Sequence, residues 1–153
     1  MIAGLVSALT LAVSTGCAPY ALRGVVVPGD TPSVQWVVPD DARLSAPGLA
    51  SARVTVWLDP DRLSPEKIGE ATTDGAGRFA LPIHASGAGV LMMDVEVRGQ
   101  RPPDHGSATG KLQLPRRGRR LLITLKPGPD HDPRPAGNLL DQTLRDAEPF
   151  LRK

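Results

Sequence analysis

The residue types that most often do chemistry are few in this chain and lie far apart in its sequence. The three histidines are His84, His105 and His131, and no pair of them has the spacing of a metal site. No serine lies in the Gly-x-Ser-x-Gly context of an exposed hydrolase nucleophile. We therefore predict no catalytic residue, no bound metal, no cofactor and no enzymatic activity.

Two acidic groups are the alternatives to that prediction. Asp130-His131-Asp132 has atoms that can bind a metal ion, although solvated loop residues are the simpler interpretation. Asp59, Asp61 and Asp74 would bind Ca²⁺ through carboxylate oxygens if all three lined one end of the fold. Asp59-Pro60-Asp61 lacks the spacing and glycine of an EF-hand loop, and aspartate is common in turns that follow strands. We interpret both groups as turn residues.

A basic cluster and two tryptophans are the remaining candidates for binding. Arg116-Arg117-Gly118-Arg119-Arg120 could contact anionic lipid headgroups or glycans, at about 1 kcal/mol per basic residue. A solvated turn that prevents aggregation of sheet edges is the simpler interpretation, and the cluster is too small to predict nucleic-acid binding. Trp57 and Trp36 are weak candidates for stacking on a sugar ring. We prefer the interpretation that the segment 28–51 covers Trp57.

The N-terminal segment predicts export to the cell envelope. Residues 2–13 are apolar and uncharged, which is too short for a membrane span but typical of a signal peptide. Ser14-Thr15-Gly16-Cys17 follows and resembles the lipobox of bacterial lipoproteins, although leucine is usual where Ser14 stands. The resemblance implies a signal peptide over residues 1–16 and a lipidated Cys17 that anchors the chain to a membrane. An ordinary secretory signal is the alternative.

Composition favours a single all-β domain. The chain has 153 residues, 16 Gly and 16 Pro, which implies many turns between short elements. Aromatic residues are only 3% of the chain, so aliphatic side chains must build the core. With one cysteine, neither an intramolecular disulfide nor a multi-cysteine zinc site is possible.

Apolar residues alternate with a period of two in short segments, which predicts strands. The predicted strands are 20–27, 33–38, 52–58, 68–73, 78–83, 90–98, 107–114 and 121–125. We expect Leu91, Met93, Val95 and Val97 to share one face of their strand. Asp74-Gly75-Ala76-Gly77 predicts a turn that joins 68–73 to 78–83 as a β-hairpin. Together these patterns predict a seven- to eight-stranded antiparallel β-sandwich.

The order of these motifs resembles a carboxypeptidase regulatory-like domain, which has a transthyretin-like (prealbumin-like) and thus Ig-like sandwich. The resemblance covers residues 20–126. Its motifs are Arg23-Gly24-Val25-Val26, Ala52-Arg-Val-Thr-Val56 and Thr72-Thr-Asp-Gly-x-Gly-x-Phe79. A long insert between Val27 and Ala52, with a strand-like run around Trp36, departs from the pattern. The resemblance implies a stability or interaction module without catalytic residues.

The C-terminal segment differs from the rest of the chain. Four prolines between Pro127 and Pro135 predict a stiff linker, because proline cannot donate to a strand ladder. Asn138 is a typical helix N-cap, and Leu140, Leu144 and Leu151 follow helical spacing. We expect a short amphipathic helix after the linker.

Three segments and one function follow from these patterns. They are a lipoprotein signal peptide over 1–16, the regulatory-like sandwich over 17–126, and the linker and helix over 127–153. We expect a non-enzymatic, lipid-anchored cell-envelope module that has a structural or protein-interaction role. Its expected partners are the membrane, through Cys17, and an envelope protein or glycan. The alternative is a carbohydrate-binding module of the starch-binding-like type, and a small transthyretin-like hydrolase is a weaker third.

Overall fold

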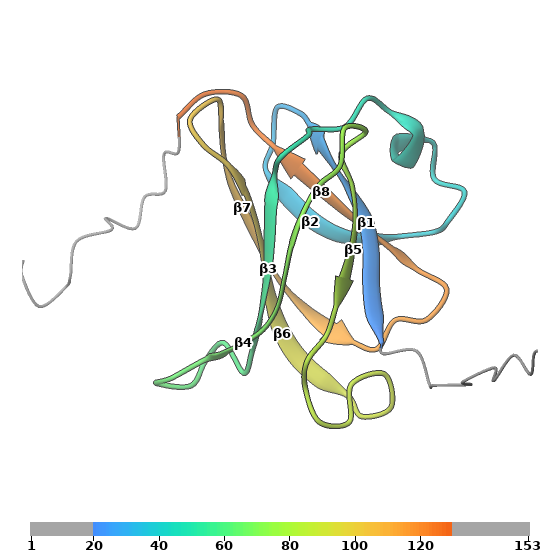
Figure 1. Ribbon diagram of the computed structural model, residues 1–153, viewed down its shortest axis with the longest axis vertical. Helices are drawn as coiled ribbons and strands as arrows, with labels where there is room; N and C mark the ends of the chain where they lie inside the picture. Colours follow the sequence, from blue (N-terminus) through green and yellow to red (C-terminus); the bar gives the residue numbers. More distant parts are fainter. Residues whose placement is uncertain (1–19, 130–153) are drawn as a thin grey trace, which may run out of the picture.

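Eight strands and one short 3-10 helix make up the structure, a computed structural model that describes residues 20–129 (Figure 1). Cys17, the signal peptide, most of the predicted linker and the predicted C-terminal helix lie outside the described residues. The elements are β1 (Ala21–Pro28), β2 (Ser33–Val37), η1 (Ala42–Ser45), β3 (Arg53–Leu58), β4 (Glu66–Thr72), β5 (Arg78–Pro82), β6 (Met93–Arg101), β7 (His105–Leu114) and β8 (Arg120–Leu125).

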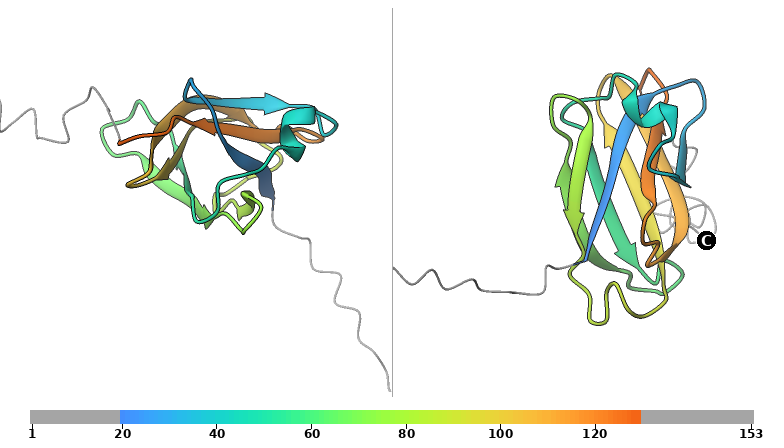
Figure 2. Two further views of the ribbon diagram at one scale, coloured as in Figure 1. Left: turned by 90° about the horizontal axis from the view of Figure 1, so that it is seen from above. Right: turned by 90° about the vertical axis from the view of Figure 1, so that its right-hand side faces the viewer.

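The strands form two four-stranded sheets that face each other, so the prediction of an all-β sandwich is confirmed (Figure 2). The first sheet has the order β2-β8-β1-β5, and the second has the order β4-β3-β6-β7. Every pairing is antiparallel except that between β1 and β8, which is parallel. The prediction of an antiparallel sandwich is therefore confirmed for the other pairs and was wrong at this one. β7 ends at the end of the sandwich where β1 begins, so β8 must leave in the same direction as β1.

The turn at Asp74–Gly77 does not close a β-hairpin, and that prediction was wrong. β4 pairs with β3 in the second sheet, whereas β5 pairs with β1 in the first. The turn is therefore an arch that carries the chain from one sheet to the other. Ile68 of β4 and Leu81 of β5 are both buried in the core between the sheets. Side chains on the two arms meet across the core, whereas a hairpin would place them side by side on one sheet.

Local hydrogen bonds shape this arch. The Asp74 carboxylate accepts hydrogen bonds from the backbone N–H groups of Ala76 and Arg78, both at 2.9 Å. Gly77 has a φ of 75°, in the left-handed region that favours glycine. A Cβ on Gly77 would also lie 2.5 Å from the Cα of Gly48, because the segment 46–52 passes directly over the arch.

Thr73 joins the segment 46–52 to the arch. Its side chain is buried, donates a hydrogen bond to the carbonyl of Leu49 at 2.6 Å and accepts one from the N–H of Ala52 at 2.9 Å. The backbones of Thr73 and Ala52 are also paired, since the Thr73 N–H donates to the Ala52 carbonyl at 2.9 Å. Leu49 in turn donates its N–H to the carbonyl of Val26 in β1, at 2.7 Å. The Thr73 side chain thus attaches the insert to the arch, and the Leu49 N–H attaches the insert to the first sheet.

Aliphatic side chains fill the space between the sheets, as the composition predicted. Within residues 20–129, Phe79 is the single aromatic residue among the buried residues of this core. The core residues are Leu22, Val26, Ala52, Val54, Val56, Ile68, Phe79, Leu81, Ile83, Val95, Val97, Ala108, Leu114, Leu121, Ile123 and Leu125. Val95 and Val97 therefore share one face of their strand, as predicted, and that face is turned to the core.

Leu91 does not belong to this core, which corrects the predicted strand 90–98. β6 begins only at Met93, where its pairing with Leu114 of β7 begins. Val90, Leu91 and Met92 lie before it in a loop, with 78%, 58% and 66% of their surfaces exposed. Alternation in the sequence extends past the point where a neighbouring strand is present, so it overestimates the strand.

The insert between β1 and β3 contributes a strand and a cover. β2 extends the first sheet at its edge beside β8. The 3-10 helix η1 then brings Leu44 onto the outer face of that sheet. There Leu44 packs against a second, smaller apolar cluster, formed by Val25, Val27, Val37 and Leu122.

Replacement of Thr73 by valine tests the role of the arch. The change keeps the shape of the side chain but leaves the Leu49 carbonyl and the Ala52 N–H without their side-chain partner. We expect a loss of about 1–3 kcal/mol in the free energy of unfolding, measured by urea titration. The matched control is Thr72→Val at an exposed position, which should change stability by less than about 0.5 kcal/mol. Equal effects of the two variants would contradict the assigned role.

Candidate functional site

Three neighbouring strands of the first sheet place arginines on its outer face. β5, β1 and β8 lie side by side and contribute Arg78, Arg23 and Arg120. Arg78 is directly opposite Val25, whose side chain belongs to the outer apolar cluster, so the two share this face. Arg23 lies two positions before Val25, and Arg120 lies two positions before Leu122, which is also in that cluster. Because alternate residues of a strand share a face, Arg23 and Arg120 are on the outer face as well.

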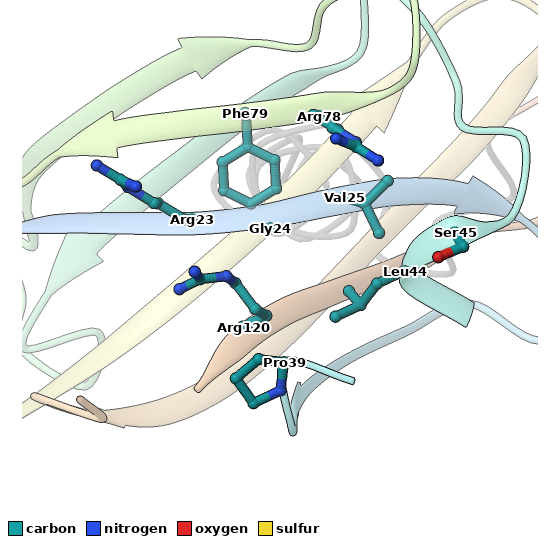
Figure 3. A pocket seen from close by; sticks show the side chains of 9 residues that line it. All are labelled: Arg23, Gly24, Val25, Pro39, Leu44, Ser45, Arg78, Phe79 and Arg120. Carbon is teal, nitrogen blue, oxygen red and sulfur yellow. The ribbon is translucent and has the colours of Figure 1, made fainter. Parts of the chain in front are cut away.

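These arginines line a groove of about 410 Å³ between the sheet and the insert (Figure 3). Val25 and Phe79 contribute to its sheet side, and Pro39, Leu44 and Ser45 of the insert contribute its other wall. In Figure 3 the side chains of Arg23 and Arg120 extend in the same direction from neighbouring strands, while Arg78 lies beside Val25. The groove therefore combines an apolar base with three positive charges.

Among the described residues, none that lines this groove is acidic. Within residues 20–129, none of the three guanidinium groups has a carboxylate within 4.0 Å, although seven other ion pairs are present there. Arginine binds carboxylates and phosphates through paired N–H donors, and it does so best where no internal anion competes. The arrangement is suited to binding an anionic group.

The wall of the groove at η1 is ordered by an ion pair between Asp41 and Arg43. The Asp41 carboxylate accepts hydrogen bonds from the Arg43 backbone N–H and Nε, both at 3.0 Å, and from Nη2 at 2.7 Å. The side-chain hydrogen bonds from Arg43 lower the pKa of Asp41 from 3.8 to about 2, and the backbone bond adds to the effect. The same pairing raises the pKa of Arg43. The pair caps the helical turn that positions Leu44.

The two predicted tryptophans lie in different sheets and do not form one site. Trp36, in β2, packs against the main core, and its Nε1 is buried without a hydrogen-bond partner among the described residues. Trp57, in β3, is half-buried and lies opposite Lys67 and Glu96 of the adjacent strands. It follows the inward-facing Val56, so its ring is on the outer face of the second sheet. The insert covers the first sheet, so the interpretation that it covers Trp57 was wrong.

The three aspartates proposed for calcium do not meet. Asp59 and Asp61 follow β3 at the end of the sandwich where β1 begins, whereas Asp74 lies in the arch at the opposite end. Asp59 pairs with Arg62 at 3.1 Å, and Asp61 pairs with Lys111. Within 20–129 no cluster of three or more His, Cys, Asp or Glu residues is placed to hold a metal ion.

The histidine candidates are also separated. The ring Nδ1 of His105 lies 3.2 Å from Nη1 of Arg101, near the β6–β7 connection. His84 follows β5 at the other end of the sandwich. His131, with its flanking aspartates, lies outside the described residues.

Arg23 and Arg78 were not predicted from the sequence as binding residues, and Arg120 was predicted only as part of the basic turn. Arg23 and Arg78 occupy outward positions in predicted strands, whereas Arg120 lies just before the predicted strand 121–125. What the sequence did not show is that β5, β1 and β8 are neighbours, since they are far apart along the chain. Only the strand order places the three charges together.

Comparisons with protein-family models, curated proteins and solved structures found no match to this chain. Within the described residues, no helix is long and apolar enough to cross a membrane.

Titration of Asp41 tests the ordered wall of the groove. We expect carboxyl NMR signals to report a pKa of about 2, and Arg43→Gln to return it toward 3.8. Because the folded-state pKa is lowered, the pair contributes to stability above pH ~4 and loses that contribution as the pH falls toward 2. An Asp41 pKa unchanged by Arg43→Gln would contradict the assignment.

Anion binding tests the groove itself. We expect tripolyphosphate to bind the protein, and the triple change Arg23→Gln, Arg78→Gln and Arg120→Gln to weaken binding about tenfold, since three exposed pairs contribute roughly 0.2–1 kcal/mol each. The matched control is Arg53→Gln, Arg62→Gln and Arg98→Gln, which removes the same charge from arginines that already have carboxylate partners. Calorimetry that gives equal losses for both triples would show only a net-charge effect and contradict the site.

Proposed function

We propose that the chain is a lipid-anchored module of the cell envelope, exported by residues 1–16 and attached to a membrane through Cys17. The observation that supports this most directly is the short distance, in sequence, between anchor and fold. β1 begins at Ala21, only four residues after Cys17. A lipid on Cys17 would therefore hold the sandwich close to the bilayer, and anchors with more than one acyl chain bind stably.

The module acts by binding rather than by reaction. Its fold is a transthyretin-like, carboxypeptidase regulatory-like sandwich, and its role is structural or in protein interaction. Two four-stranded sheets and the Thr72–Phe79 motif at their connection support that fold. The arginine groove supports a binding role, because Arg23, Arg78 and Arg120 line one space and have no carboxylate partner within residues 20–129. The group bound there is the carboxylate or phosphate of an envelope partner.

A carbohydrate-binding role is the second candidate, and one observation favours it. Trp57 is on the outer face of the second sheet and only half-buried, so one side of its ring can be reached. Trp36 is not suited to this role because it packs against the core. This role depends on Trp57, and we expect Trp57→Ala to remove binding to envelope polysaccharide while Trp36→Phe retains it.

Metabolic labelling with a radioactive fatty acid tests the anchor. We expect label in the full-length protein, found in the membrane fraction, and none in Cys17→Ala, because the chain has no second thiol. Thr72→Ala, an exposed change in the sandwich, should leave labelling unchanged. Fatty-acid label that persists in Cys17→Ala would refute the anchor.

A further inference from the structure

The large hydrophobic side chains that are exposed are concentrated at one end of the sandwich. Within residues 20–129 five such side chains are exposed, and four of them lie in two loops at the end where β1 begins. Leu63 is in the β3–β4 loop, and Val90, Leu91 and Met92 are in the β5–β6 loop. The fifth, Val38, is less exposed, at 42%.

Strand directions define this end, which we name the N-terminal end. β3, β5 and β7 run toward it, and β4, β6 and β8 leave it, so the three loops that join these strands lie at this end, in the lower part of Figure 1. The arch and the β6–β7 turn lie at the opposite end, at the top of Figure 1. The N-terminal end is therefore the one from which the chain leads back to Cys17.

The β5–β6 loop holds its apolar residues in a defined turn. The N–H groups of Val90 and Leu91 both donate to the carbonyl of Gly87, at 3.0 and 2.9 Å. Gly87 and Gly89 have φ values of 78° and 85°, and a Cβ on Gly89 would meet the Tyr20 side chain at 3.0 Å. This turn leaves the side chains of residues 90–92 in solvent, although each is a residue type normally found in a core.

A basic turn is bonded directly to this loop. The guanidinium of Arg117 donates to the carbonyl of Gly89 at 2.7 Å, and the N–H of Arg116 donates to the Tyr20 hydroxyl at 3.3 Å. Arg116, Arg117 and Arg119 are exposed, and within 20–129 none has a carboxylate within 4.0 Å. Of the acidic residues at this end, Asp59 and Asp61 are paired with other basic side chains. Asp94 accepts a hydrogen bond from Gln113 at 3.0 Å, and Glu66, at the start of β4, has no ion pair within residues 20–129.

We propose that the N-terminal end lies against an anionic phospholipid surface, with residues 90–92 in the headgroup region and the Arg116–Arg119 turn on lipid phosphates. An apolar loop beside unpaired cations matches the two layers of such a surface, which is apolar beneath and negative above. The proposal rests on the proposed anchor at Cys17. Tyr20 follows Cys17 by three residues, which span at most about 11 Å. A lipid on Cys17 therefore brings this end of the sandwich, and no other, to the bilayer.

A fluorescent label at position 91 tests the docking. With Cys17 lipidated, Leu91→Cys supplies the only free thiol in the full chain, and Gly75→Cys supplies a matched position in the arch at the opposite end. The label is an environment-sensitive dye, and the vesicles are phosphatidylcholine with or without phosphatidylglycerol. We expect a blue shift and a severalfold rise in emission at position 91 on the anionic vesicles, and no change at position 75. Adding Arg116→Gln and Arg119→Gln should reduce the shift at position 91.

The outcomes separate docking from anchoring. A chain that floats with vesicles but keeps water-like emission at position 91 overturns the docking and leaves the anchor intact. A blue shift at position 91 without lipid also overturns it, because a second copy or another protein then covers the loop. If the chain carries no lipid, the anchor fails, and Cys17→Ser with Leu91→Cys is added to the same vesicles. A blue shift at position 91 of this variant on the anionic vesicles, and not on the neutral ones, then supports docking without an anchor. No blue shift on the anionic vesicles overturns the docking.

Discussion

The structure depends most on the point where the chain passes from one sheet to the other, at Asp74–Gly77. The arch determines that β4 pairs with β3 and β5 with β1, so each sheet receives one arm and the core forms between them. The Thr73 side chain attaches the insert segment 46–52 to this arch through two hydrogen bonds. The same insert then continues over the outer face of the first sheet, where Leu44 packs and the arginine groove is bounded. A change at the arch would therefore alter the position of the insert at the groove, although the two are in different parts of the fold.

The sequence predicted where strands are better than how they pair. Alternating apolar residues located all the strands within a few residues, because that pattern reflects burial of one face. The Asp-Gly turn was misinterpreted because an Asx turn and a left-handed glycine suit an arch as well as a hairpin. Whether the turn closes a hairpin or forms an arch depends on which strand each arm pairs with, and the arms' partners are not determined by the residues of the turn. The parallel pairing of β1 with β8 was missed for the same reason, since the two strands are separated by most of the domain.

The candidate site was likewise hidden in the sequence, because it depends on how the strands pair. Arg23 and Arg78 were predicted at outward strand positions and Arg120 in a turn, but only the order β8-β1-β5 makes the three one charged surface. The exposed apolar residues of the β5–β6 loop looked like the start of a strand until the pairing of β6 was known. Both features lie on or beside β1. The first strand thus connects the groove on its outer face with the N-terminal end at its start, and the lipid predicted at Cys17 would give that strand a fixed direction relative to a membrane.

The claim that joins these features is that the sandwich stands on the bilayer by its N-terminal end. Neutron reflectometry of the lipidated protein on a supported bilayer that contains phosphatidylglycerol measures this directly. The account predicts protein density that starts within the headgroup layer and extends roughly 30 Å into solvent, the length of strands of eight to ten residues at about 3.3 Å per residue. A layer of water between the headgroups and the protein would contradict it.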